Sequence, residues 1–253
     1  MRSLIAAIRF LTRLRAPGPP TRAEDLPGSV GWFPLVGGAA NAAVAGLAVA
    51  ATLWWPPTIA AVVAIAAGLL LTGGFHEDAA ADAADGLGGG ADNDKILAIM
   101  RDSRIGAYAG MALWVVLTLR WAVLVHLLSL PGLSAVAIWA AAGAWGRWTA
   151  APLLAALPPL SAGLAKDIGS AASWPTIALA TLLALAVAAF AGWLIGPPVW
   201  IAAGVAVALT GFWGIYLWRR LGGQSGDLLG AGNLIVELGF ALALIAAQRA
   251  LAA

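Results

Sequence analysis

Acidic residues are concentrated in one short part of this sequence. Seven of the twelve Asp and Glu residues lie between Glu77 and Asp102. In the run FHEDAAADAADG, Asp78, Asp82 and Asp85 are spaced i, i+4 and i+7, so a helix would place all three on one face. These stacked like charges repel each other, and Mg²⁺ would relieve the repulsion because it prefers oxygen ligands and binds through few carboxylates plus phosphates. The spacing therefore favours a magnesium site that grips a pyrophosphate and stabilises a leaving group.

Simpler explanations exist for parts of this acidic segment. A solvated acidic loop is the ordinary alternative for the whole run, but the helical spacing and the position at the edge of an apolar stretch weigh against it. Asp92 or Asn93 is expected to be the N-cap of a following helix in DNDKILAIMRDSR, and Asp94 to be a first-turn acid favoured by the helix dipole. We therefore leave these three residues out of the predicted site.

The glycines at positions 86, 88, 89 and 90 are expected to form a turn that folds this second helix back against the first. Asp102, Ser103 and Arg104 would then face the acidic residues. Arg101 or Arg104 would act as a fork for phosphate oxygens, because a guanidinium can donate two parallel hydrogen bonds.

The composition indicates that these residues sit on a membrane bundle. Of the 253 residues, 62% are hydrophobic and 10% are charged, and the mean hydropathy is +0.90. A soluble fold could not bury that much apolar surface. There is no basic block for nucleic acid, and without cysteine any metal ligands must be oxygens or the two histidines. We predict an all-α, polytopic integral membrane helical bundle that forms one domain over residues 1–253.

Apolar stretches of spanning length predict about seven transmembrane helices. An N-terminal helix in MRSLIAAIRFLTRLR carries Leu and Ile near one face with Arg among them, so it is expected to lie on the membrane, with residues 1–22 forming this helix and a link. Residues 76–106 would be a cytoplasmic segment that holds the acidic motif. The expected spans are 30–53, 58–75, 107–128, 134–157, 173–195, 197–218 and 228–248.

The positive charges support this arrangement. With seven spans, eleven Lys and Arg residues fall on one side of the membrane and only Arg249 falls on the other, so the positive-inside rule makes the first side cytoplasmic. Arg120 and Arg147 are left inside the bilayer. The eleven are Arg2, Arg9, Arg13, Arg15, Arg22, Lys95, Arg101, Arg104, Lys166, Arg219 and Arg220.

Ionisable and polar residues also occur within the last predicted span. Asn233 and Glu237 lie at membrane depth, where such residues are costly and are candidates for function, with a buried structural pair as the alternative. Glu237 would pair with Arg120 or Arg147, although Arg147 could instead point toward a pyrophosphate or the polar edge of a substrate. Asp227, at the start of that span, suits either helix capping or metal contact.

The run TGGFHEDAAADAADGLGGG, followed by IMRDSRIGAYAG, resembles the signature of the cobalamin synthase family, whose members are adenosylcobinamide-GDP ribazoletransferases. The segments FLTRLRAP at 10–17, FPLVGG at 33–38 and GGQSGDLLGAGNLIVELG at 222–239 are also similar to that family. The resemblance thus spans nearly the whole chain, in order. It departs at Ala79, where Gly is expected; this removes no ligand but could alter how closely the backbone approaches the substrate.

The resemblance implies that a hydroxyl of α-ribazole, or of its 5′-phosphate, attacks the phosphorus on the cobinamide side of adenosylcobinamide-GDP. A phosphodiester forms and GMP leaves, with Mg²⁺ required. Glu77, Asp78, Asp82 and Asp85 are expected to be metal ligands, and Glu77, Asp82 and Asp85 are candidates for the catalytic base. The candidate substrate-binding residues are Asp102, Ser103, Arg104, Arg101, Arg147, Asp227, Asn233 and Glu237.

The resemblance also implies a multi-pass protein of the bacterial inner membrane, with the N-terminus and the acidic motif in the cytoplasm. Besides lipid and the two substrates, we include self-association and contact with other enzymes of cobalamin synthesis among the expected partners.

His76 could ligate a metal, although a hydrogen-bonded structural role is the more ordinary one.

Three other functions remain open at this stage. A CDP-alcohol phosphotransferase would need an Arg after the first aspartate motif, and the chain has none there. A prenyltransferase would need a second Asp-rich motif, and GDLLGAGN has only one Asp. A cation transporter would more naturally place its carboxylates at mid-membrane on broken helices.

Overall fold

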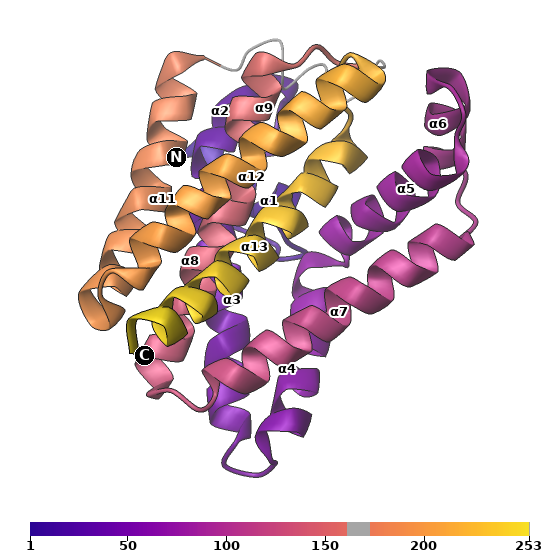
Figure 1. The fold of residues 1–253 in the computed structure, drawn as a ribbon. Coiled ribbons are helices and arrows are strands. Elements are labelled where there is room, and N and C mark those ends of the chain that lie inside the picture. Colours follow the sequence, from indigo (N-terminus) through magenta and orange to yellow (C-terminus); the bar gives the residue numbers. More distant parts are fainter. Residues whose placement is uncertain (161–172, 253) are drawn as a thin grey trace.

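The computed structural model describes residues 1–160 and 173–252, and within these ranges the chain folds into a bundle of α-helices (Figure 1). The predicted fold class is therefore confirmed. Lys166, which we placed on the cytoplasmic side, lies outside the described residues. The helices in the seven expected ranges are α3 (Phe33–Ala51), α4 (Pro57–Thr72), α7 (Ala107–Leu127), α8 (Gly132–Trp148) continued by α9 (Ala150–Ala156), α11 (Trp174–Ile195), α12 (Pro198–Leu221) and α13 (Gly226–Ala252).

The lengths of the helices give a lower count of membrane spans than the sequence predicted. In the part of the chain that the structure describes, five stretches are long and apolar enough to span, and a sixth follows if α4 and α5 (Phe75–Gly89), bent by 88°, are counted as one. α4 has 16 residues and α8 has 17, which is fewer than the roughly 20 that a straight span needs. The expected count of about seven spans stays a prediction.

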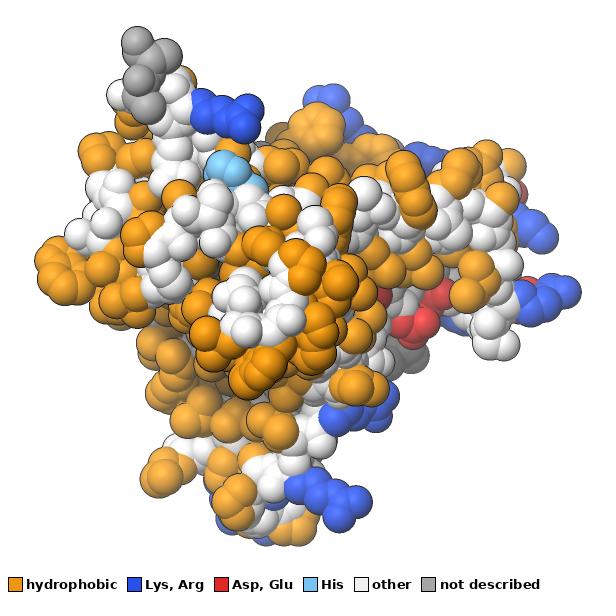
Figure 2. Space-filling view, turned by 90° about the horizontal axis from the view of Figure 1, so that it is seen from below, with side chains coloured by type: hydrophobic (Ala, Val, Ile, Leu, Met, Phe, Trp, Pro, Cys, Tyr) orange, Lys and Arg blue, Asp and Glu red, His pale blue; other side chains and the backbone are white. Residues whose placement is uncertain are grey.

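The outer surface of the bundle suits a lipid environment. Figure 2 shows a face dominated by hydrophobic side chains, with Lys and Arg toward its margins and most of the visible acidic surface in one recess. Large apolar side chains such as Leu70, Trp114, Trp193 and Phe212 are at least 70% exposed. In water this would be an aggregation hazard, whereas in a bilayer it is the expected surface.

Small residues allow the helices to approach one another closely. α3 packs along α8, and a Cβ atom added to Gly143 would lie 2.6 Å from the Gly37 carbonyl oxygen. Such backbone contact is available only to glycine. Small-residue interfaces are the common way to gain packing energy between helices in lipid, where the hydrophobic effect does not drive helices together.

The N-terminal segment forms a helix as expected, but a shorter one. α1 (Arg2–Leu11) ends before the Pro-rich link, and the Arg9 guanidinium donates hydrogen bonds to the carbonyl oxygens of Ala16, Gly18 and Pro19. This side chain fastens the link to the helix. The chain then enters α3 through two short 3₁₀ turns and α2 (Leu26–Ser29).

The segment after α4 bends sharply because two consecutive glycines adopt left-handed backbone angles. Gly73 and Gly74 have φ values of 72° and 67°, which favour glycine, and they turn the chain from α4 into α5. The predicted second helix, α6 (Asn93–Met100), does fold back against α5, and Asp92 caps it by accepting a hydrogen bond from the Lys95 backbone N–H at 2.8 Å.

The position of that turn differs from our expectation. Gly86, Gly88 and Gly89 lie within α5, and only Gly90 falls in the turn. The physical reason is close packing: a Cβ atom at Gly86 would lie 2.6 Å from the Met100 side chain, and one at Gly88 would lie 2.6 Å from the Tyr108 ring. The glycines therefore serve to bring α6 and α7 against α5.

The helix ends separate into two groups (Figure 1). The α3–α4, α7–α8 and α11–α12 connections and the C-terminus lie toward the lower part of the view, whereas α6 and the α12–α13 connection lie toward the upper part. Arg219 and Arg220 end α12 at the upper side, and Arg249 lies in the last turn of α13 at the lower side. The predicted topology places Arg219 and Arg220 on the opposite side of the membrane from Arg249, and these residues do lie at opposite ends of the bundle.

Candidate functional site

The acidic motif forms the helix α5, as the spacing predicted, and α5 packs against both α7 and α13. Its four carboxylates have different surroundings. Glu77 and Asp85 are buried, Asp82 is half-buried and Asp78 is exposed. The motif thus has a side that faces neighbouring helices and a side that faces open space.

Asp85 acts as a cap for another helix. Its two carboxylate oxygens accept hydrogen bonds from the backbone N–H groups of Gly106, at 2.6 Å, and Ala109, at 2.8 Å. These groups belong to the N-terminal end of α7, where N–H donors lack partners within the helix. A Cβ atom at Gly106 would lie 2.6 Å from Asp85 Oδ1, so glycine is needed there. In this arrangement Asp85 holds α5 and α7 together and has little freedom to bind a metal ion.

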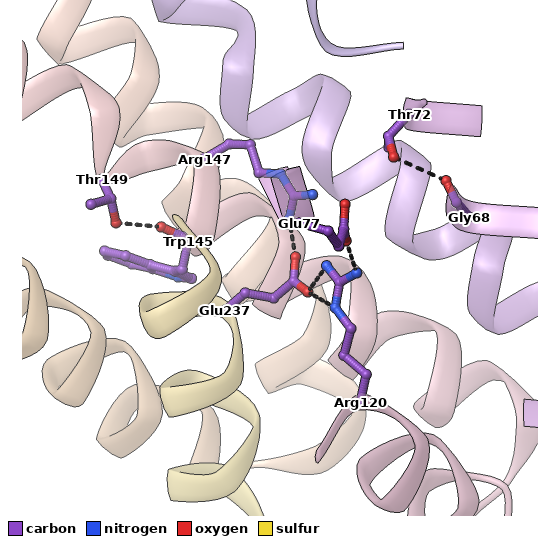
Figure 3. A network of polar contacts seen from close by, with 8 residues as sticks. All are labelled: Gly68, Thr72, Glu77, Arg120, Trp145, Arg147, Thr149 and Glu237. Carbon is purple, nitrogen blue, oxygen red and sulfur yellow. Dashed lines mark hydrogen bonds and ion pairs between the residues drawn. The ribbon is translucent and has the colours of Figure 1, made fainter. Parts of the chain in front are cut away.

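Glu77 belongs to a buried network of four charges (Figure 3). Arg120 of α7 donates to Glu77 Oε1, and it also donates through Nε at 3.0 Å and Nη2 at 2.5 Å to Glu237 Oε1 on α13. Arg147 of α8 donates to the other oxygen of Glu237. The expected pairing of Glu237 with Arg120 or Arg147 is confirmed, and both arginines take part.

This network joins helices far apart in the sequence. Glu237 is fully buried, and the side chains of Arg147, Glu77 and Arg120 are 3%, 9% and 11% exposed. Buried charges of this kind are tolerated only when paired. The geometry therefore gives no support to the expectation that Arg147 and Glu237 contact substrate, because these two side chains form an ion pair with each other.

Asp78, Asp82 and Asp227 form a cluster of a different kind. Asp78 and Asp82 line one pocket, and Asp78 and Asp227, which lies in the first turn of α13, line another. Within residues 1–160 and 173–252, the side chains of these three aspartates make no ion pair, and those of Asp78 and Asp82 accept no hydrogen bond. Their mutual repulsion is thus not relieved by any described cation of the chain.

A polar pocket of about 590 Å³ is lined by all four carboxylates of α5, those of Glu77, Asp78, Asp82 and Asp85. As expected, residues 101–104 form the opposite part of its lining, together with Ile105 and Leu113. Arg101 is exposed and makes no ion pair with any residue that the structure describes. The pocket therefore pairs carboxylates on α5 with a cation and a hydroxyl from the segment after α6.

Arg104 is already engaged within this pocket. Its guanidinium donates to both oxygens of Asp102, with the shortest contact at 2.6 Å. These side-chain hydrogen bonds, with a further one from the Arg104 backbone, lower the pKa of Asp102 to about 2. The same contact raises the pKa of Arg104. Of the two arginines predicted to bind phosphate oxygens, Arg101 is thus the one whose guanidinium is not engaged by any described residue and is free to do so.

An apolar cavity of about 200 Å³ lies on the other side of Asp78. Phe10, Phe33 and Phe75 form an aromatic part of its wall, and Asp78 and Asp227 contribute carboxylates to its lining. The remaining lining residues are Leu11, His76, Ala79, Ala150, Leu154, Gly226, Leu229, Gly230 and Asn233. Sequence reasoning missed this cavity, because its wall comes from α1, α3, α5, α9 and α13.

Ala79, the one departure from the family pattern, packs where the two helices are closest. A Cβ atom added to Gly230 of α13 would lie 2.5 Å from the Ala79 Cβ atom. Space for a side chain at position 79 therefore depends on glycine at position 230. The Ala79 methyl group thus fills space between α5 and α13 and replaces none of the carboxylates.

The donors at this site suit a magnesium ion only in part. Among the described residues, no group of three or more His, Asp or Glu side chains is arranged so that it could hold a metal ion by itself. Asp78 and Asp82 nevertheless offer oxygen ligands with no other partner, and Mg²⁺ usually binds through one or two carboxylates plus substrate phosphates and water. The residues therefore fit an ion that arrives with a phosphorylated substrate.

Taken together, the fold and the site define a helical membrane protein in which unpaired carboxylates lie between a polar pocket that contains two arginines and an aromatic cavity. Residues 3–245 match the family model described as "Cobalamin-5-phosphate synthase", CobS. The chain belongs to this family, and the resemblance noted in the sequence is confirmed.

Curated relatives agree over most of their length. The adenosylcobinamide-GDP ribazoletransferase of Laribacter hongkongensis is 39% identical, with 98% of each chain covered. The proteins of the same name from Thiobacillus denitrificans and Klebsiella pneumoniae are each 36% identical, covering 92% and 97% of this chain and 90% and 100% of their own. No solved structure matches the chain.

Proposed function

We propose that this protein is a Mg²⁺-dependent adenosylcobinamide-GDP ribazoletransferase. It joins adenosylcobinamide-GDP to α-ribazole, or to α-ribazole 5′-phosphate, and releases GMP. Membership of the family supports the reaction, and the match over residues 3–245 argues against the CDP-alcohol phosphotransferase, prenyltransferase and transporter alternatives.

One structural observation supports the location of the chemistry. Asp78 and Asp82 are carboxylates without a described cationic partner, and they lie where a pocket with an arginine and a serine meets an apolar aromatic cavity. A transferase of this kind must bring a diphosphate and an aromatic nucleoside together. The two cavities on either side of Asp78 provide for those two chemistries.

The transfer replaces a phosphoanhydride bond with a phosphate ester bond. The acceptor hydroxyl oxygen bonds to the phosphorus on the cobinamide side, the bond from that phosphorus to the bridging oxygen breaks, and GMP leaves with that oxygen. The hydroxyl proton passes to a carboxylate of the cluster, for which Asp82 is suited because its side chain is free of hydrogen bonds in the described part of the chain. Arg101 and Ser103 bind phosphate oxygens and orient the diphosphate.

Asp78 and Asp82, with Asp227 beside them, are the residues that would hold Mg²⁺. When bound, the ion neutralises charge on the diphosphate and stabilises the leaving phosphate. Glu77 and Asp85, which we also expected to be ligands, instead keep α5 in place through Arg120 and the α7 N-terminus. We therefore assign them a positioning role.

The test is GMP release by purified protein in lipid-supplemented detergent, supplied with adenosylcobinamide-GDP, α-ribazole and Mg²⁺. We expect GMP only when both substrates are present, and loss of release when EDTA removes Mg²⁺. Asp82→Asn should lower the rate on the order of 10²–10³-fold, as removal of one electrostatic stabiliser does in other enzymes.

The matched control is Asp94→Asn, the same change at an exposed position of α6 outside the pocket lining. It should leave the rate unchanged. Release of GMP without Mg²⁺, or equal rates for Asp82→Asn and the unaltered protein, would contradict the proposed site.

The proposal includes a topology in the bacterial inner membrane, with the N-terminus, α6 and the polar pocket in the cytoplasm. The Lys and Arg distribution supports it. Because the chain has no cysteine, single cysteines report on their side of the membrane. Ala250→Cys should react with an impermeant maleimide in intact cells, and Asp94→Cys only after lysis; the opposite pattern would reverse the topology. Gly90, in the turn before α6, is less suitable for a cysteine label, since a Cβ atom there would lie 2.3 Å from the Ile96 side chain.

A further inference from the structure

The apolar cavity has the lining of a site for an aromatic group. Phe10 stacks on Phe33 with ring centroids 5.5 Å apart and planes 8° apart, and Phe75 meets Phe10 edge-on at 5.3 Å. Aromatic groups pack well against such stacked and edge-on rings. The cavity of about 200 Å³ is continued by aliphatic residues of α9 and α13, Leu154 and Leu229 among them.

His76 lines this cavity, and a hydrogen bond defines which of its ring nitrogens carries the proton. When the Asn233 amide is oriented so that its nitrogen donates to the carbonyl oxygens of Gly146, at 2.8 Å, and Leu229, at 3.3 Å, its oxygen lies 3.2 Å from His76 Nε2. Nε2 must then carry the proton. In the neutral ring Nδ1 is left as a hydrogen-bond acceptor.

This acceptor has no partner among the residues that the structure describes, although His76 is only 1% exposed. A buried acceptor without a partner costs free energy, so a ligand that supplies a donor would be favoured at this place. A hydroxyl group is such a donor. The cavity thus combines an aromatic wall with a lining histidine whose Nδ1 is an unsatisfied acceptor.

The cationic side chains differ between the two cavities. Carboxylates line both of them, but Arg101 and Arg104 line the polar pocket, and no described Lys or Arg lines the apolar cavity. A guanosine diphosphate group in the apolar cavity would therefore meet Asp78 and Asp227 without any guanidinium to offset them, and the polar edge of its guanine would find few partners. The pocket with Arg101 and Ser103 is the better place for that group.

We propose that this cavity binds the acceptor, with the aromatic base of α-ribazole against Phe10, Phe33 and Phe75 and a ribose hydroxyl donating to His76 Nδ1. The ribose then lies next to Asp78, at the boundary with the pocket that holds the diphosphate. This assignment rests on the proposed function and adds to it which substrate each cavity takes. His76 is a binding residue in this arrangement, and Asn233 is a positioning residue that fixes its tautomer.

The experiment uses two neighbouring leucines of α9. Leu154 lines this cavity, whereas Leu153 lines a separate pocket beside α12, and both are at most 5% exposed. Leu154→Trp should fill the cavity and raise KM for α-ribazole at least about tenfold, since pocket contacts of this size discriminate 10–200-fold. KM for adenosylcobinamide-GDP should not change, and Leu153→Trp should alter neither KM.

A second variant tests the polar contact and serves if Leu154→Trp does not fold. His76→Phe keeps a ring and removes the acceptor, so it should also raise KM for α-ribazole about tenfold, the effect of one lost hydrogen bond of roughly 1.4 kcal/mol. Calorimetric titration of α-ribazole into the protein without corrinoid should show binding to the unaltered chain and weaker binding to both variants. Thermal unfolding in detergent identifies any variant that has lost its fold.

The outcomes separate this assignment from the proposed function. If the unaltered protein releases GMP but Leu154→Trp and His76→Phe leave KM for α-ribazole unchanged, or raise both KM values equally, the assignment is overturned and the function stands. Such a result would fit a cavity filled by a lipid chain. If the unaltered protein neither binds α-ribazole nor releases GMP, the function itself fails.

Discussion

Two groups of charged side chains meet on α5, and their surroundings are opposite. Glu77 faces the interior, where it joins Arg120, Glu237 and Arg147 in a network that pairs all four side chains (Figure 3). The next residue, Asp78, faces open space beside Asp82 without a cationic partner in the described part of the chain. Consecutive positions of an α-helix point about 100° apart, so one acidic motif can serve both the scaffold and the site.

The comparison teaches that a carboxylate's role depends on whether the fold supplies its counter-charge. Where Arg120 and Arg147 supply it, the charges hold α5, α7, α8 and α13 together. Where the fold supplies none, as at Asp78 and Asp82, the counter-charge must come from outside, from a metal ion or a substrate. Isosteric substitutions in the two groups should therefore affect different properties of the protein.

The largest effect is expected in the buried network. Glu237→Gln removes the charge that both arginines share, and breaking a buried pair in this way costs on the order of 3–5 kcal/mol of stability. We expect a lower Tm in detergent, measured by circular dichroism, while Asp82→Asn should not lower it. An unchanged Tm for Glu237→Gln would mean that the network does not stabilise the fold.

A smaller effect is expected at the cation of the open pocket. Arg101→Ala should raise KM for adenosylcobinamide-GDP roughly 10-fold, the effect of losing a charge-assisted hydrogen bond worth about 1.5 kcal/mol. KM for α-ribazole and Tm should stay the same. Arg219→Ala, at an exposed position outside this pocket, is the control. If both arginine variants behave alike, Arg101 does not bind the diphosphate.

The smallest effect is expected from Asp102. Its pKa in the folded protein, about 2, is below its ordinary value of 3.8, so the contact with Arg104 is complete above pH 4 and is lost only as the pH falls through about 2. The pH–rate profiles of Asp102→Asn and the unaltered protein should therefore have the same shape from pH 5 to 9. A new titration step in that range for the variant would show that Asp102 influences the catalytic group.

Local patterns in the sequence predicted the local features well. The i, i+4, i+7 spacing identified α5, the cap of α6 was expected at Asp92 or Asn93 and is Asp92, and residues 101–104 were expected to face the acids. Even one long-range contact, that of Glu237 with the two arginines, followed from the high cost of unpaired charges in lipid. These predictions depend on periodicity, capping or charge balance, which are visible in the sequence.

The sequence did not predict which of the four acids hold the scaffold together and which stay unpaired at the site. Spacing shows that carboxylates share a face, but it does not show which neighbouring group forms a hydrogen bond or ion pair with each of them. The partner of Glu77 lies 43 positions away and those of Asp85 lie 21 and 24 positions away. The aromatic cavity was missed for the same reason, since Phe10, Phe33 and Phe75 come from three separate helices.

The position of Glu237 on the last helix also bears on how the protein is made. Arg120 follows Glu77 in the chain and can pair with it as soon as α7 inserts. Arg147 precedes Glu237 by 90 residues, which a ribosome takes roughly 5–18 s to add at 5–20 residues per second. During synthesis α8 therefore carries a guanidinium whose counter-ion has not yet been translated, and insertion of α13 completes the charge balance of the bundle.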